Sequence, residues 1–354
     1  MSTHTVGIDL GTSTIKVAYK EKRFKIPSII GEPNPSPFQA ITAIDTSWEN
    51  NLVIKIGDEE WYVGELARLQ SIIKIPLARE GKMKDAKSAL LAILSALGLV
   101  LPEEKTAAII ATGVPVATSE NEMRELSKLA VGHHKFRIKN EATGSEKEFN
   151  VKILAAPVLP EPYGTYYYTL KKMGIKKAFD AVIIDIGYGT TDILSIHKGV
   201  MVKPASGSCT EAVDTIVEKL VAYIESKTGE LLKPEAIAIA LEKGLKIAVK
   251  GVTYDLKPQV AALANYVAKS IIDTLDRLLR NLPADAMIKY YIICGGGAYI
   301  LGPYIKKALT ETYGVKSEQI IVPDEPILSN ALGFELVAQY YMSKITRKTR
   351  EGSQ

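Results

Sequence analysis

One pattern occurs twice in this chain, and it limits the folds that the chain can adopt. Residues 6–16 read VGIDLGTSTIK, and residues 183–192 read IIDIGYGTTD. Each copy is an apolar run ending in aspartate, followed by a turn rich in glycine and threonine and the start of a second strand-like run. Such a pattern predicts a β-hairpin with a tight glycine turn. Duplication is the economical explanation, and it predicts two related halves.

The length and composition are those of a folded protein with two domains. The chain has 354 residues, of which 47% are hydrophobic and 24% are charged. The net charge of +4 is spread along the chain, which favours a solvated surface over a direct nucleic-acid interface. Cys209 and Cys294 are the two cysteines, so neither a disulfide framework nor a cysteine-based zinc site is expected.

The ends of the chain carry no targeting signal that we recognise. Residues 2–5 are polar and lead straight into a strand, without the basic and apolar regions of an export signal. No apolar stretch is long enough to cross a bilayer. We therefore expect a cytoplasmic protein with no membrane association, and a frayed C-terminal tail at the basic run 344–350.

Apolar periodicity predicts the remaining elements. The prolines within residues 31–37 indicate an exposed loop, at the start of a β-rich insertion. Gly98 is expected to end the helix before it. Strands are expected at 52–56, 60–63, 106–112, 135–138, 148–153, 151–159, 246–254, 290–294 and 319–322. Helices are expected at 85–97, 122–131, 163–173, 211–226, 234–241, 258–282, 303–313 and from residue 329 onward.

The two glycine turns are suited to bind phosphate. A tight turn of this kind exposes backbone N–H groups and hydroxyls, which form concave anion sites, and the aspartate before each turn supplies the hard oxygen that Mg²⁺ prefers. Later, a glycine triplet follows a buried strand and leaves room for a flat ring because it has no Cβ. The alternative is a pair of ordinary hairpins and a loop. The turn and triplet residues are Gly11, Thr12, Ser13, Thr14, Gly187, Tyr188, Gly189, Thr190, Gly295, Gly296 and Gly297.

These three motifs together resemble those of the actin, Hsp70 and sugar-kinase ATPase superfamily. Residues 9–16 are similar to its first phosphate loop, 185–192 to its second, and 292–298 to its adenosine motif. The resemblance implies an α/β fold of two duplicated actin-like (RNase H-like) domains, each a mixed five-stranded sheet flanked by helices, with ATP in the interdomain cleft. The implied domains are residues 1–160 with 330–354, and residues 161–329. Their smaller subdomains would be about residues 31–75 and about residues 209–257.

The resemblance also implies roles for individual residues. Asp9 and Asp185 would hold Mg²⁺, Asp185 would in addition be catalytic, and Lys16 would reach the β- or γ-phosphate of ATP. Glu161 matches an acidic residue that orients the attacking water in the ParM-like branch, or it is a helix-start glutamate favoured by the helix dipole. The remaining nucleotide contacts would come from Glu218, Lys219 and Tyr299, although Glu218 and Lys219 also fit a charged helix face.

Within the superfamily the chain is most similar to ParM-like and archaeal actin-like proteins. The printed sequence ends soon after the last expected core helix, so a chaperone of the Hsp70 type, with its long peptide-binding region after the ATPase core, is not expected. The expected function is an actin-like ATPase that self-associates into nucleotide-dependent filaments, for plasmid segregation or cytoskeletal organisation. A DNA-bound adaptor protein is the implied further partner. Two alternatives remain open: a small-molecule (sugar-type) kinase of the same fold, and an ATP-binding scaffold that does not polymerise.

Overall fold

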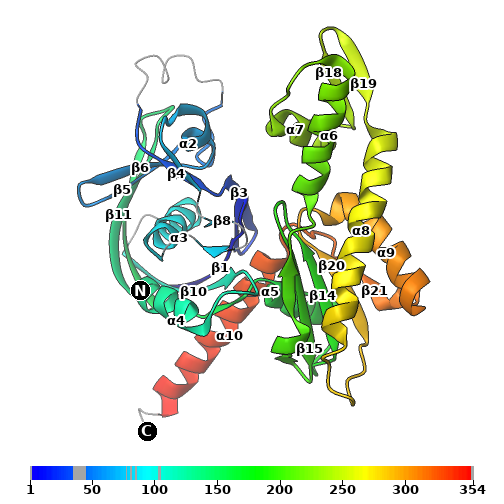
Figure 1. Cartoon of the computed structure of the whole chain (residues 1–354). Coiled ribbons are helices and arrows are strands. Elements are labelled where there is room, and N and C mark those ends of the chain that lie inside the picture. Colours follow the sequence, from blue (N-terminus) through cyan, green and yellow to red (C-terminus); the bar gives the residue numbers. More distant parts are fainter. Residues whose placement is uncertain are drawn as a thin grey trace. The chain divides into compact units, whose positions relative to one another are not determined.

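The chain folds into two compact units. The computed structural model describes residues 2–34, 45–76, 78–79, 82–83, 86–102 and 105–351. One unit contains Met1–Ala178 together with Leu328–Gln354, and the other contains Phe179–Ile327. In Figure 1 the first unit runs from blue to green and includes the red helix α10 Ser329–Glu351, and the second runs from green to orange.

One mixed sheet forms the framework of the first unit. Its strands are β1 Thr3–Leu10, β2 Thr14–Tyr19, β3 Lys22–Pro27, β4 Ile29–Gly31, β5 Leu52–Ile56, β6 Glu59–Val63, β7 Lys74–Pro76, β10 Thr106–Val114, β11 Gly132–Asn140, β12 Glu146–Ala155 and β13 Val158–Pro160. The order is β3-β2-β1-β10-β12-β11-β5-β6-β4-β7, with β13 beside β10. The hairpins expected at the N-terminus and over 52–63 are confirmed. The expected strand over 151–159 is divided between β12 and β13. A separate two-stranded sheet joins β8 Ala78–Arg79 and β9 Lys82–Met83.

Helices cover both faces of this sheet. They are α2 Glu65–Gln70, α3 Ala86–Val100, α4 Glu120–Ala130, α5 Pro162–Lys172 and α10 Ser329–Glu351. Side chains of a strand alternate between the two faces, and β10 shows which helices cover each face. Ala108 and Ile110 join the core formed with α3, whereas Ile109 and Ala111 pack with Phe334 of α10. The sheet curves around α3 (Figure 1).

The region expected as a β-rich insertion belongs to the main sheet. β11 pairs with β5, so β4 to β7 extend the sheet rather than forming a separate layer. Residues 35–37 of the expected proline loop lie outside the described residues.

Gly98 does not end α3, so that prediction was wrong. The helix continues to Val100. A Cβ added at Gly98 would lie 2.7 Å from Ile138 Cγ2 and 3.3 Å from Phe136 Cε2. Glycine here lets the helix approach β11 closely, and the apolar residues after it continue the buried face of the helix.

The second unit has a smaller sheet and its own core. Its main sheet has the order β16-β15-β14-β20-β21, with β17 beside β15, and a two-stranded sheet joins β18 and β19. The strands are β14 Ala181–Ile186, β15 Thr191–His197, β16 Val200–Met201, β17 Gly207–Cys209, β18 Lys246–Val249, β19 Val252–Asp255, β20 Tyr290–Cys294 and β21 Ile320–Ile321. The helices are α6 Val213–Thr228, α7 Pro234–Glu242, α8 Lys257–Leu279 and α9 Ala298–Tyr313, with 3₁₀ turns η1 Lys203–Ala205 and η2 Ser317–Gln319.

Three expected elements differ in the structure. Residues 246–254 form a hairpin rather than one strand, because Lys250 and Gly251 both have positive φ and make a turn. α9 begins at Ala298 rather than 303 and contains Pro303, since its buried Leu301 and Ile305 pack into the core. The basic run 344–350 continues α10 as helix where a frayed tail was expected.

The boundaries between the units also differ from the expected ones. The first lies between residues 178 and 179 rather than after residue 160, and the second lies between 327 and 328. The reason is that α5 packs closely against α10. A Cβ added at Gly333 of α10 would lie 1.7 Å from the carbonyl oxygen of Gly164 in α5. The two helices therefore belong to one packed unit.

Candidate functional site

The first hairpin pairs its aspartate with its lysine. Asp9 and Lys16 are directly opposite each other in the β1–β2 ladder, and Lys16 Nζ donates a hydrogen bond of 2.8 Å to Asp9 Oδ2. The side chain of Asp9 is 1% exposed and that of Lys16 is 14% exposed. Because a buried carboxylate requires compensation of its charge, Lys16 is part of what allows Asp9 to be buried here.

The turn between these two residues is shaped by glycine. A Cβ added at Gly11 would lie 2.9 Å from the carbonyl oxygen of Thr14 and 3.0 Å from Lys16 Nζ. Ser28, between β3 and β4, supports the turn: its hydroxyl donates to Gly11 O, and its N–H donates to Ser13 O over 2.9 Å. The Ser13 side of the turn is exposed, so the turn can meet an anion with its hydroxyls and backbone.

Glu161 lies at the same edge of the sheet as Asp9. Asp9 is opposite Gly113 in the parallel β1–β10 pair, and Glu161 N donates a 2.8 Å hydrogen bond to Val114 O, the next carbonyl along β10. Glu161 is the N-cap residue of α5 and is 9% exposed. Two buried carboxylates are thus brought to the carboxyl ends of β1 and β13, the strands that flank the end of β10 on either side.

The second hairpin repeats the geometry of the first. Gly187 N donates to Thr190 O over 2.8 Å, and a Cβ added at Gly187 would lie 2.9 Å from that oxygen, the same distance as between Gly11 and Thr14 O. Asp185 is buried near the end of β14 and lies opposite Asp192 of β15. The duplication predicted from the sequence is therefore visible in the turns themselves.

The glycine triplet packs mainly against the end of β14. Gly295 has a φ of 82°, and a Cβ added there would lie 2.3 Å from Ile186 O and 2.4 Å from Asp185 Oδ1. A Cβ at Gly297 would lie 2.3 Å from Ile186 Cγ2. Two of the three glycines thus permit contact with the strand that carries Asp185, which is a packing reason for glycine at these positions. Only at Gly296 is the nearest atom, Ile327 Cδ1, at an ordinary distance of 3.6 Å.

The two charged residues assigned to α6 have different neighbours. Lys219 Nζ lies 5.6 Å from the ring centroid of Tyr266 on α8, so it faces α8. Glu218 is exposed, and its charge is among the causes that raise the pKa values of Tyr188 and Asp214. The charge of Glu218 therefore acts on residues of and beside the second glycine turn, whereas Lys219 lies against Tyr266 of α8. Tyr299, in the first turn of α9, is 64% exposed.

Asp214 borders the second turn, the charge of Glu235 acts on Tyr188 within that turn, and the sequence analysis missed both residues. Asp214 N donates to Tyr188 O over 2.8 Å, and a Cβ added at Gly189 would lie 3.4 Å from Asp214 Oδ2. Burial raises the pKa of Asp214. Burial also raises the pKa of Tyr188, and the charges of Asp214 and Glu235 add to that. An acidic residue in the first turn of both α6 and α7 was the available signal.

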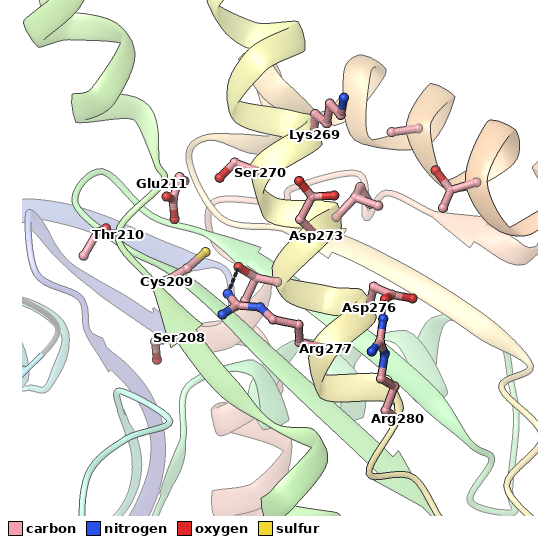
Figure 2. A pocket seen from close by; sticks show the side chains of 14 residues that line it. Ser208, Cys209, Thr210, Glu211, Lys269, Ser270, Asp273, Asp276, Arg277 and Arg280 are labelled. Atoms are coloured by element: carbon pink, nitrogen blue, oxygen red, sulfur yellow. Dashed lines mark hydrogen bonds and ion pairs between the residues drawn. The ribbon is translucent and has the colours of Figure 1, made fainter.

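A cavity of about 870 Å³ lies in the second unit beside the connection from β17 to α6. Figure 2 shows side chains of α8 around it, with Arg277 pointing toward Cys209. Its cations are Lys269, Arg277 and Arg280, and its acids are Glu211, Asp273 and Asp276. Burial raises the pKa of Cys209 to about 12, so its thiol stays protonated at neutral pH. Because three basic and three acidic side chains line the cavity, their charge favours neither an anionic nor a cationic ligand.

The residues present fit a magnesium ion that is held partly by its nucleotide. Among the described residues no three or more His, Cys, Asp or Glu side chains gather as a metal cluster. Mg²⁺ commonly takes one or two protein carboxylates, and substrate phosphates and waters supply the rest. Asp9 Oδ1 is buried and has no hydrogen-bond partner among the described residues, so this oxygen can still accept a bond from a metal-bound water.

Within the described residues no helix is long and apolar enough to cross a membrane.

Two family models match the chain in succession. Residues 7–164 match the model "Actin like proteins N terminal domain", and residues 183–307 match "Archaeal actin homologue MreB-like, C-terminal". Together they span most of the chain and include both hairpins.

Known proteins show the same likeness over nearly the whole chain. The actin-like protein MamK of Paramagnetospirillum magneticum (strain AMB-1) is 24% identical over 86% of this chain and 84% of its own. The archaeal actin homologue Ta0583 in complex with ADP has a TM-score of 0.73 at 21% identity, covering 96% of this chain and 100% of that structure. A 15-stranded ParM filament from Clostridium botulinum has a TM-score of 0.74 at 23% identity, with the same coverage of both chains.

These solved structures confirm the predicted fold class, although the sheet of the first unit is wider than the five strands expected. With one family model on each unit and MamK similar along most of the length, the chain belongs to the family of actin-like proteins.

Proposed function

We propose that this protein binds Mg-ATP through its two phosphate hairpins and hydrolyses it. The observation that carries the proposal is the repeated turn: each unit has a glycine turn of the same geometry, preceded by a buried aspartate. One of the structurally similar proteins was solved with ADP and another, ParM of Bacillus thuringiensis, with AMPPNP. Both are adenine nucleotides, which supports ATP as the ligand.

The residues of each unit have distinct roles in this proposal. The turns Gly11 to Thr14 and Gly187 to Thr190 bind phosphate oxygens with backbone N–H groups and hydroxyls. Asp9 and Asp185 hold Mg²⁺, which neutralises charge on the phosphates. Lys16 donates to the same phosphates and to Asp9. The segment from Gly295 to Gly297, with Tyr299 and Glu218, contributes to the nucleoside side of the site; a Cβ at Gly296 would meet Ile327 at an ordinary contact distance.

Glu161 is the proposed catalytic carboxylate. Hydrolysis of ATP depends mainly on positioning and charge stabilisation, and a carboxylate can orient the attacking water and accept its proton. Asp9 lies near the carboxyl end of β1, and Glu161 directly follows β13. Both strands flank β10, so the two residues lie at one edge of the first sheet. That edge would place a water-orienting group beside the metal-binding group. Asp185 would help to hold the Mg²⁺ ion.

We also propose that the protein assembles into nucleotide-dependent filaments. A structurally similar ParM was solved as a filament, and repeated head-to-tail contacts that do not close produce filaments. Loss of the γ-phosphate would remove contacts to the turns and so weaken the assembly. Plasmid segregation through a DNA-bound adaptor, or organisation of cell contents, are the roles that such filaments would serve.

Light scattering and phosphate release test the proposal together. The protein is mixed with ATP, with ADP or with no nucleotide, each with Mg²⁺, and we expect a scattering rise with ATP and a fall as phosphate is released. Absence of a rise under all conditions would remove the filament claim. ATP binding without turnover would indicate a scaffold, and transfer of phosphate to added sugars would indicate a kinase.

Glu161→Gln tests the catalytic role separately. We expect unchanged ATP binding and a rate of phosphate release lowered by about 100-fold, since general-base groups contribute about 10²- to 10⁴-fold. Glu120→Gln is the matched control, because Glu120 also begins a helix but is exposed. Equal rates for both variants would show that Glu161 only stabilises its helix.

A further inference from the structure

Gly113 occupies a crowded position in the sheet between the strand of Asp9 and the strand that leads to Glu161. It is near the end of β10, opposite Asp9 of β1 on one side and Leu159 of β13 on the other. The next residue, Val114, accepts the backbone hydrogen bond of Glu161. Gly113 therefore lies between the strand that carries Asp9 and the helix start that carries Glu161.

There is no space for a side chain at this position. A Cβ added to Gly113 would lie 2.9 Å from Glu161 Cγ and 2.6 Å from both Cε2 and Cζ of Phe334. All three contacts are shorter than real Cβ contacts, so an alanine here would force a neighbour to move. The φ of Gly113 is not in the left-handed region, so crowding by neighbours, rather than backbone strain, makes a side chain unfavourable here.

Of the two neighbours, Glu161 is the one that can move. Phe334 is fully buried in a cluster with Ile109, Ala111 and Ala338, and protein interiors are too closely packed for a ring to shift freely. The backbone of Glu161 is held by the Val114 hydrogen bond. Its side chain, however, can rotate about χ1 and χ2 into another staggered rotamer.

We propose that Gly113 is a positioning residue for ATP hydrolysis, because the space left by its missing side chain is taken up by the Glu161 side chain, at the edge of the sheet where Asp9 also lies. This inference rests on the proposed function, in which Glu161 orients the attacking water. A larger residue would leave the nucleotide-binding turns intact but would displace the carboxylate. Displacements of about 1 Å can lower a rate by about 100-fold.

A double-mutant cycle between Gly113→Ala and Glu161→Ala tests the proposal. The readouts are the single-turnover rate of phosphate release and the dissociation constants of ATP and ADP, all measured on the full chain. We expect Gly113→Ala to lower the rate by about 10- to 100-fold and to leave both dissociation constants within about threefold. In the Glu161→Ala background the same substitution should change the rate by less than about twofold, because the group that it displaces is gone.

Two further variants separate positioning from general damage to the core. Gly113→Ala with Phe334→Leu relieves the contact to the ring but not the one to Glu161, so the rate should stay low. Gly98→Ala introduces a similarly short contact, 2.7 Å to Ile138 Cγ2, away from this edge, and should keep the wild-type rate.

Each other outcome overturns a defined claim. Restoration of the rate by Phe334→Leu, or an equal effect of Gly113→Ala with and without Glu161, would show that Gly113 acts only through packing. If Glu161→Ala alone leaves the rate unchanged while Gly113→Ala lowers it, the catalytic role of Glu161 is wrong and Gly113 acts by another route. A wild-type protein without ATP turnover would overturn the proposed function and, with it, this inference.

Discussion

Asp9 and Lys16 face each other across the first hairpin, and their carboxylate and ammonium groups are 2.8 Å apart although both side chains are largely buried. Removal of one member of a buried ion pair leaves an uncompensated charge, which costs about 3 to 5 kcal/mol. The pair therefore contributes to folding, and in the proposed function the same two groups meet the metal and the phosphates. In the proposed function, stability and nucleotide binding would thus depend on one pair of side chains.

Lys16→Met should destabilise the protein and weaken ATP binding. The unpaired Asp9 carboxylate should lower the free energy of unfolding by about 3 kcal/mol, measured by urea denaturation. ATP affinity, measured by calorimetric titration, should fall by at least about tenfold because a charged donor to the phosphates is lost. Lys25→Met is the matched control: Lys25 is opposite Lys16 on β3 but exposed. If both variants behave alike, the pair has no special role.

Asp9→Asn should remove the effect of Mg²⁺ on ATP affinity without removing ATP binding itself. Asparagine keeps the shape but removes the charge that Mg²⁺ requires, so the gain in ATP affinity on adding Mg²⁺ should largely disappear. Binding of ATP without metal should be equal or tighter, since Lys16 is then freed for the phosphates. The measurement is ATP titration with and without Mg²⁺, with Asp58→Asn in the exposed β5–β6 turn as control. A Mg²⁺ dependence like that of the wild type would show that Asp9 does not serve the metal.

The local parts of this site were accessible from the sequence. A run of apolar residues, an aspartate and a glycine turn are enough to predict each hairpin, since the turn length fixes which residues are opposite each other. The Asp9–Lys16 contact follows from that register. The role of Gly295 could not be predicted in the same way, because its crowding comes from Asp185 and Ile186, more than 100 residues earlier in the chain.

Longer-range packing explains where the sequence-based predictions failed. Gly98 and Pro303 are ordinary signals for a helix end or start, yet both lie inside helices whose buried faces pack on distant strands. The pairing of β5 with β11, which extends the first sheet, joins segments about 80 residues apart and has no local signature. Gly113 directly follows the expected strand 106–112, but its closeness to Glu161 depends on the pairing of β10 with β13.

Glu335 should make stability depend on pH. It is 7% exposed on α10, and its Oε1 accepts a 2.6 Å hydrogen bond from Lys20 N. Burial raises the pKa of Glu335 more than that hydrogen bond and the Arg23 charge lower it. The folded state therefore holds the proton more tightly than the unfolded state, so the contribution of this group is fully present below its ordinary pKa of 4.5. It is lost as the pH rises through the raised value.

Glu335→Gln keeps the acceptor for Lys20 but cannot ionise. We expect a melting temperature above that of the wild type at pH 7 and a difference that shrinks toward zero as the pH falls to about 4. Glu21→Gln, in the exposed turn beside Lys20, should show no such trend. A Glu335→Gln variant that is less stable than the wild type at pH 7 would mean that the charged form, through Arg23, is the favoured one.

Gly333→Ala should lower stability far more than a helical glycine substitution normally does. Its Cβ would lie 1.7 Å from Gly164 O and 2.4 Å from Gly164 C, and these backbone atoms cannot move without separating α5 from α10. Overpacking of this kind costs about 3 kcal/mol, measured as the free energy of unfolding in urea. Gly302→Ala is the control, since Gly302 is also inside a helix but its Cβ would meet nothing closer than Ile293 Cγ2 at 3.9 Å. That control should gain up to about 1 kcal/mol from higher helix propensity, so opposite signs for the two variants are expected, and equal signs would contradict the close packing of α5 on α10.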